Sequence, residues 1–300
     1  MLWAGGAFEV GPCAYRSQVW FERAFRVFAV ERRGTLWDSR FAPARSATGP
    51  GSTVLCVLLD GFLTWNEPAP LALTAPAAFL STEESLEGAG GQRAHTLRNG
   101  GEPFRAVELR LRPDLVLPKL EARPREIALP SAVIDAGTKV HTASSTGEDP
   151  VSAVTRLIAT LSATGILVPA ATETIVLDEP PRLTRIWDAV RGLYMRHETA
   201  PSLQEIAEHA GVSLRQLARD IDELSTTFPL GADGYRELTG DVRLRWAVLL
   251  LSSPSLRIAD VALRAGYGSS VALGRALREA GLPTPGAVRR ALQEDPRAVR

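Results

Sequence analysis

The chain has 300 residues, and its 34 Lys and Arg residues balance its 34 Asp and Glu residues, so the formal net charge is zero. This balance excludes a protein built on a polybasic tail, and it gives no bulk electrostatic argument for binding to nucleic acid or to a membrane surface. The length suggests two domains, and 45% hydrophobic residues are ample for two cores.

The composition also argues against export and membrane insertion. No stretch approaches the roughly 18 to 20 uninterrupted apolar residues of a membrane span, and the start MLWAGGAFEV lacks the pattern of a signal peptide. Cys13 and Cys56 are the only cysteines, too few for a disulfide scaffold or a cysteine-based zinc site. We therefore expect a cytoplasmic protein with reduced thiols and no membrane association.

The first predicted domain covers residues 1–148, and its residues from 1 to about 115 read as short strands. Apolar segments separated by Gly- and Pro-rich turns are typical of an antiparallel sandwich or barrel, and no long helical pattern interrupts them. No glycine-rich phosphate loop is present. The expected strands cover residues 25–31, 52–59, 62–65, 77–81 and 104–112.

A helical period begins near residue 150 and is followed by a linker, together covering residues 149–182. Asp149 followed by proline is a reasonable helix start, and the helix over 151–166 has one apolar seam. The seam could pack on the β-structure or pair with its copy in a homodimer, and both possibilities stay open. Three prolines over 169–181 indicate the linker. The seam consists of Val151, Val154, Ile158 and Leu161.

The last part, residues 183–300, contains an internal repeat. Residues 203–221 align with 258–277 at an offset of 55 that becomes 56 after one inserted residue, and each copy reads as helix, tight turn, helix. Such a motif needs a small residue where the helices cross, a glycine in the turn and an N-cap for the second helix. These are Ala207, Gly211 and Ser213 in the first copy, and Ala262, Gly266 and Ser269 in the second.

Two helix-turn-helix motifs are therefore predicted, at about 203–224 and 257–280. Gln216 lies three residues after Ser213, as in a capping box. A connecting helix over about 235–252 would be roughly 27 Å long. A helix of this length could place the two second helices in successive major grooves, which lie about 34 Å apart.

Residues 183–292 resemble the C-terminal domain of the AraC/XylS family of transcription regulators. The resemblance rests on LQEIAEHAGVS and LARDI in the first motif, RLRWAVLLL in the connecting helix, and RIADVALRAGY in the second motif. It implies that the second helix of each motif enters the major groove of double-stranded DNA, and that RNA polymerase is a further partner. By motif matching, the DNA-binding residues are Arg215, Arg219, Ser270, Val271 and Arg275.

The chain departs from the family pattern at several positions. Leu273 and Leu277 stand where the family usually has aromatic residues, and Gly274 weakens the second recognition helix. Acidic residues around 220–223 lie beside Arg219 and would repel phosphates. Residues 183–300 carry 16 basic and 14 acidic side chains, a net charge of only +2, which predicts modest affinity.

The resemblance further implies that the first part is a cupin-like barrel that binds a small effector or mediates dimerisation. His95 could be a hydrogen-bonded barrel residue or an effector contact, and Trp37 and Trp65 are candidate contacts. Enzymatic cupins bind their metal through an early His-x-His pair. This chain has no such pair, because its four histidines are His95, His141, His197 and His209. We therefore expect no metal, no cofactor and no enzymatic activity.

The fold class expected is α+β, an N-terminal antiparallel β-barrel followed by an all-α DNA-binding domain. The expected function is sequence-specific transcription regulation. Two alternatives remain, a cupin-type enzyme with an appended helical domain and an interaction scaffold that no longer binds DNA.

Overall fold

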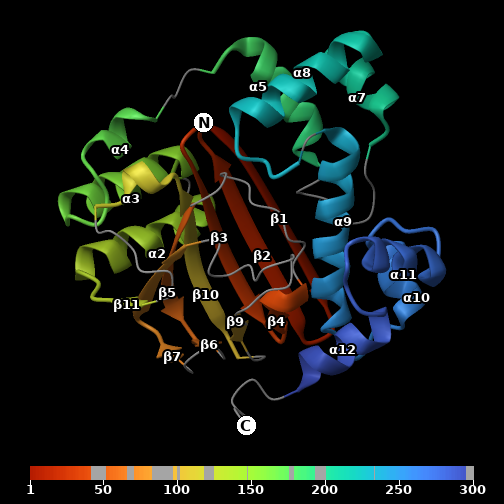
Figure 1. The fold of residues 1–300 in the computed structure, drawn as a ribbon, viewed down its shortest axis with the longest axis horizontal. Coiled ribbons are helices and arrows are strands. Elements are labelled where there is room, and N and C mark those ends of the chain that lie inside the picture. The colour runs from red at the N-terminus through yellow and green to blue at the C-terminus, as the bar shows by residue number, and fades with distance from the viewer. Residues whose placement is uncertain are drawn as a thin grey trace.

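The computed structural model describes residues 1–41, 52–65, 71–82, 97–99, 102–117, 125–146, 148–175, 179–192, 201–232 and 234–294. The chain is α+β, as predicted: antiparallel sheets come first and helices follow (Figure 1). The seven strands of the larger sheet are, in spatial order, β1 (Leu2–Val10), β2 (Cys13–Phe21), β3 (Phe25–Arg33), β10 (Phe104–Leu111), β5 (Thr53–Asp60), β8 (Ala77–Thr82) and β11 (Arg125–Ile127). The smaller sheet contains β4 (Trp37–Asp38), β9 (Leu97–Asn99), β6 (Phe62–Trp65) and β7 (Leu71–Thr74).

The expected barrel is not closed. Among the described strands, β1 pairs only with β2 and β11 only with β8, so the larger sheet has two edges. The hairpin of β1 and β2 was not predicted, because Gly5 and Gly6 interrupt the apolar pattern of β1. Its tight turn includes Gly11, whose φ of 57° lies in the left-handed region that glycine adopts without strain.

One face of the larger sheet is covered by α2 (Ser131–Thr146) and α3 (Pro150–Ala163). Asp149 caps α3 as expected, accepting hydrogen bonds from the backbone N–H groups of Val151 and Ser152. The apolar seam of α3 packs on α2, which in turn packs on β3, β5 and β10, and all of them share one hydrophobic cluster with odd-numbered side chains of the sheet such as Val27 and Val107.

The prediction that this seam forms a dimer interface is therefore wrong. Val154, Ile158 and Leu161 are fully buried within the chain, and Val151 packs against the same cluster. The intramolecular alternative is the correct one, since α2 and the cluster that it shares with the sheet offer the apolar partner that the seam requires.

The helical part begins after the short helix α4 (Ala170–Glu173) and is anchored on the sheet through α5 (Pro181–Val190). Trp187 of α5 donates its indole N–H to the carbonyl oxygen of Trp3 at 2.8 Å, and its ring lies edge-on to Phe21. The remaining helices are α7 (Leu203–Ala210), α8 (Leu214–Thr227), α9 (Tyr235–Leu251), α10 (Ile258–Arg264), α11 (Ser270–Glu279) and α12 (Pro285–Gln293).

The predicted connecting helix is confirmed as α9, which has 17 residues and is therefore about 25 Å long. Figure 1 shows α9 beside the larger sheet, with α7 and α8 near one end and α10 to α12 along the other. Buried residues of the sheet and of α9 belong to one hydrophobic cluster. In the described ranges, no helix combines the length and apolarity needed to cross a bilayer.

Candidate functional site

The first helix-turn-helix is formed by α7 and α8. Gly211 ends α7 with a φ of 67°, and Ser213 accepts a hydrogen bond from the backbone N–H of Gln216 at 3.2 Å. The side chain of Gln216 binds Asp220 at 2.8 Å, so the reciprocal half of the expected capping box is not made. A complete capping box lies one helix earlier, between Ser202 and Glu205.

The second helix-turn-helix is formed by α10 and α11 with the same local geometry. Gly266 follows α10 with a φ of 78°, and Ser269 caps α11 by accepting a hydrogen bond from the backbone N–H of Ala272 at 3.2 Å. Ala262 is fully buried, and its counterpart Ala207 in the first copy is 3% exposed, as required of residues at the crossing point of two helices.

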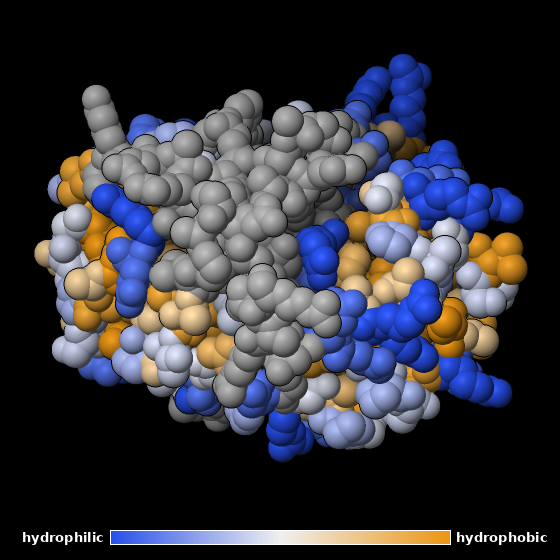
Figure 2. Space-filling view, turned by 60° about the horizontal axis from the view of Figure 1, so that its bottom comes forward, coloured by the Kyte–Doolittle hydropathy of each residue, from blue (hydrophilic) through white to orange (hydrophobic). Residues whose placement is uncertain are grey.

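The DNA-binding residues predicted from the sequence are all exposed, and they lie on two helices. Arg215 and Arg219 are four residues apart on α8, and Val271 and Arg275 are four residues apart on α11, so each pair shares a helix face. Val271 is 72% exposed, the highest exposure among the large hydrophobic residues described. The right-hand part of Figure 2, where α10 to α12 lie, combines a mainly hydrophilic surface with isolated hydrophobic side chains.

The acidic residues beside Arg219 are in large part neutralised within the protein. Asp220 is fully buried and accepts a hydrogen bond from Arg182 of α5 at 2.7 Å. Arg182 also forms an ion pair with Glu223. The repulsion of phosphates expected from these two carboxylates is therefore reduced, while Asp222 remains exposed. No sequence signal had identified Arg182, because it lies 38 residues from Asp220.

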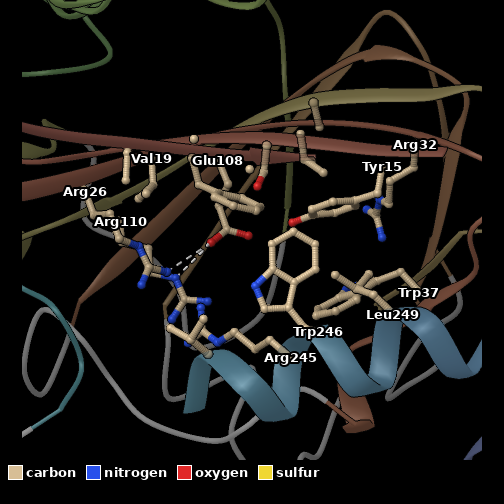
Figure 3. Close-up of a pocket in the computed structure, with 18 of the residues that line it drawn as sticks. Tyr15, Val19, Arg26, Arg32, Trp37, Glu108, Arg110, Arg245, Trp246 and Leu249 are labelled. Carbon is tan, nitrogen blue, oxygen red and sulfur yellow. Dashed lines mark hydrogen bonds and ion pairs between the residues drawn. The ribbon is translucent and has the colours of Figure 1, made fainter. Parts of the chain in front are cut away.

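A cavity of about 170 Å³ lies between the larger sheet and α9 (Figure 3). Alternate side chains of β2, β3 and β10 form its sheet wall, because successive residues of a strand point to opposite faces. Trp246 and Leu249 of α9 form part of the opposite wall. The indole of Trp246 lies edge-on to Phe8 and Tyr15, with ring centroids 5.7 and 5.4 Å apart. The wall residues from β2, β3 and β10 are Tyr15, Ser17, Val19, Phe21, Arg26, Phe28, Val30, Arg32, Phe104, Ala106, Glu108 and Arg110.

One end of the cavity holds a group of charged side chains. Glu108 accepts a hydrogen bond from Nε of Arg110 at 2.8 Å, and Nη2 of Arg26 lies 3.7 Å from the same carboxylate oxygen. Burial raises the pKa of Glu108, but the attraction of Arg110 and Arg26 outweighs that effect, so the pKa lies below its ordinary value. Arg245 of α9 faces this group (Figure 3).

Arg32 lies elsewhere on the sheet wall, among aromatic rings. In the strand register it stands opposite Tyr15 on β2 and Phe104 on β10. Its guanidinium carbon lies 4.3 Å from the ring centroid of Phe104 and 5.4 Å from that of Trp37. Arg32 is 6% exposed, and burial lowers its pKa to about 10, so it remains a cation at neutral pH.

The effector contacts predicted from the sequence have different outcomes. Trp37 lines the cavity. His95 and the side chain of Trp65 lie outside the described residues. Arg32 and Trp246 were not predicted as contacts of this cavity. For Arg32 a signal was available, because Arg26 and Arg32 occupy even-numbered positions of the otherwise apolar segment FRVFAVERR and so lie on one face of the strand. Over the described ranges, no group of three His, Cys, Asp or Glu residues could hold a metal ion.

No protein-family model and no curated protein matches the sequence. The structure is similar to several solved structures at low sequence identity. ToxT from Vibrio cholerae is 9% identical with a TM-score of 0.36, covering 88% of this chain and 98% of ToxT. ToxT with a bound unsaturated fatty acid is 11% identical with a TM-score of 0.38, covering 91% and 98%. The AraC-like transcriptional activator CuxR is 11% identical with a TM-score of 0.33, covering 88% and 91%.

Proposed function

We propose that this protein is a sequence-specific DNA-binding transcription regulator of the AraC type, controlled by a small molecule bound between the sheet and α9. The observation that carries the proposal is the pair of capped helix-turn-helix motifs joined by α9, each with arginine exposed on its second helix. A guanidinium can form two parallel hydrogen bonds with O6 and N7 of guanine, and each such pair contributes about 1–3 kcal/mol of discrimination.

The position of α9 supports control by a ligand. The same helix supplies Trp246 to the cavity and packs against α10, α11 and α12 on its other sides. A molecule that binds in the cavity therefore contacts the element that separates the two recognition helices. If its affinity differs between two positions of α9, binding shifts the spacing of these helices and with it the affinity for DNA.

The test is selection of binding sites from random double-stranded DNA, followed by titration of the selected site at several salt concentrations. We expect Arg219→Ala and Arg275→Ala each to weaken specific binding by roughly 5- to 150-fold, corresponding to about 1–3 kcal/mol. Arg125→Ala, on exposed β11 at the far edge of the sheet, is the matched control and should change nothing.

The alternatives give different results in the same experiments. An interaction scaffold would show no salt-dependent association with DNA. A cupin-type enzyme would carry a stoichiometric transition metal after purification. Contact with RNA polymerase and a homodimer formed through another surface remain predictions, checked by transcription in vitro and by sedimentation.

A further inference from the structure

Arg32 has an environment that a purely structural arginine would not require. It is nine-tenths buried, yet in the part of the chain that the structure describes its Nε has no hydrogen-bond partner, and no carboxylate forms an ion pair with its guanidinium. Glu108, the carboxylate of the cavity, is bound by Arg110 and Arg26 instead. Glu108 attracts Arg32 only at longer range, and a buried cation without a carboxylate in direct contact is unfavourable, so this site favours the binding of an anion.

The geometry also indicates how an anion would bind. The rings of Phe104 and Trp37 lie near the guanidinium, and Figure 3 shows Arg32 reaching from β3 into the space between Tyr15 and Trp37. A guanidinium that packs against rings through its faces still presents N–H groups along its edge, where a carboxylate forms two parallel hydrogen bonds. Among the described residues that line the cavity, four are arginines, Arg26, Arg32, Arg110 and Arg245, against the carboxylates of Glu108 and Asp241, which also favours a negative ligand.

The aromatic side chains of the cavity indicate what the uncharged part of the ligand would be. Tyr15, Trp37, Phe104 and Trp246 are aromatic, and such rings pack well against another flat ring. An apolar cavity of about 150 Å³ accommodates one benzene molecule. The cavity of about 170 Å³ therefore has room for one ring with a short acidic substituent.

We propose that the cavity binds a small aromatic monocarboxylate, with the carboxylate on the guanidinium of Arg32 and the ring against Trp37 and Trp246. The proposal rests on the function proposed above and specifies the class of its effector. Because Trp246 belongs to α9, a ring in this place touches the sheet and the DNA-binding part at once.

The experiment is calorimetric titration of the DNA-free protein with benzoate, phenylacetate and cinnamate, and with the neutral amide of each acid. We expect at least one acid to bind at least about tenfold more tightly than its amide, because only the ionised group accepts two charge-assisted hydrogen bonds. The comparison uses the unaltered protein, so it does not depend on whether a variant folds.

Variants then locate the anion. Arg32→Gln should remove the preference for acid over amide while the amide affinity stays the same, and Arg32→Lys should retain part of the preference. Arg33→Gln, at the neighbouring exposed position of β3, is the control and should bind the acids normally. The proposal is overturned if no acid binds, if acids and amides bind equally, or if Arg32→Gln binds the acids as tightly as the unaltered protein.

Failure of this proposal can be separated from failure of the proposed function. Titration with the selected operator measures DNA binding in the absence of any ligand. If the protein binds the operator but none of the acids, only the proposal of an aromatic monocarboxylate ligand is refuted. If it binds an acid but no operator, the proposed function as a DNA-binding regulator is refuted.

Discussion

Val271 provides a sharp test of how the second motif would read DNA. This valine is 72% exposed and lies one turn before Arg275 on α11, so in a major groove its methyl groups could contact the C5-methyl group of a thymine. Val271→Ala removes two methyl groups, each contributing about 0.8 kcal/mol when buried. The expected loss of operator affinity is therefore at most about 1.6 kcal/mol, or roughly fifteenfold.

The assay replaces each thymine of the selected operator in turn by deoxyuridine, which lacks only the methyl group. For the unaltered protein, one replacement in the half-site of α11 should weaken binding by roughly fourfold, the equivalent of one methyl group. For Val271→Ala the same replacement should have little effect, because the two changes remove the same contact. The free energy of unfolding should change by less than about 0.5 kcal/mol, since Val271 is exposed.

The reasoning would be refuted if the deoxyuridine profile were the same for both proteins. It would also be refuted if Val271→Ala weakened binding to random DNA as strongly as binding to the operator. That outcome would place Val271 against the sugar-phosphate backbone, where contacts do not distinguish bases.

Three further predictions concern stability and charge. Gly211→Ala should lower the free energy of unfolding by about 1 kcal/mol, because the φ of Gly211 is positive. Gly266→Ala should lower it further, because the new Cβ would also lie 3.0 Å from Nε of Arg243. Urea denaturation measures both variants, and equal losses would contradict the steric argument. Arg182→Ala should lower stability and weaken operator binding most at low salt, because it leaves the buried carboxylate of Asp220 on α8 without its guanidinium partner. An unchanged salt dependence of operator binding would show that this ion pair does not affect DNA binding. Glu108 has a pKa below its ordinary value of 4.5, so its ionised form contributes stability that is present above 4.5 and lost as the pH falls through the lower native pKa. Glu108→Gln should therefore flatten the stability profile in that acid range, as followed by denaturation at a series of pH values, and an unchanged profile would mean that the charge contributes nothing.

The helix-turn-helix motifs could be predicted because their determinants are local. Each motif is determined by three residues that lie within seven positions of one another: a small residue at the crossing point, a glycine in the turn and a capping serine. The internal repeat contains this pattern in both of its copies. The end of α8, which lies at Thr227 and not near residue 224, was harder to predict, since the chain that follows it depends on tertiary contacts. The missed capping box at Ser202 was visible in principle, because Glu205 follows three residues later.

The cavity could not be derived from the sequence for a physical reason. Both faces of β3 are covered, so the alternation of apolar and polar residues that normally distinguishes inside from outside is lost. Arg26 and Arg32 share one face of β3, but nothing local to the sequence marks them as interior residues, because only the pairing of β3 with β2 and β10 encloses them. The same limit applies to α3, whose seam indicated an apolar partner without identifying it.

The shared hydrophobic cluster of the sheet and α9 has a consequence for recombination of such proteins. The helical part cannot be exchanged at the linker alone for that of another protein with this fold, because Trp246 would lose Phe8 and Tyr15, and the sheet left behind would expose an aromatic surface. A functional chimera would need matching residues on β1 and β2 together with the new connecting helix. The sheet and the helices from α5 onward thus form one folding unit, and heat should unfold them in a single transition.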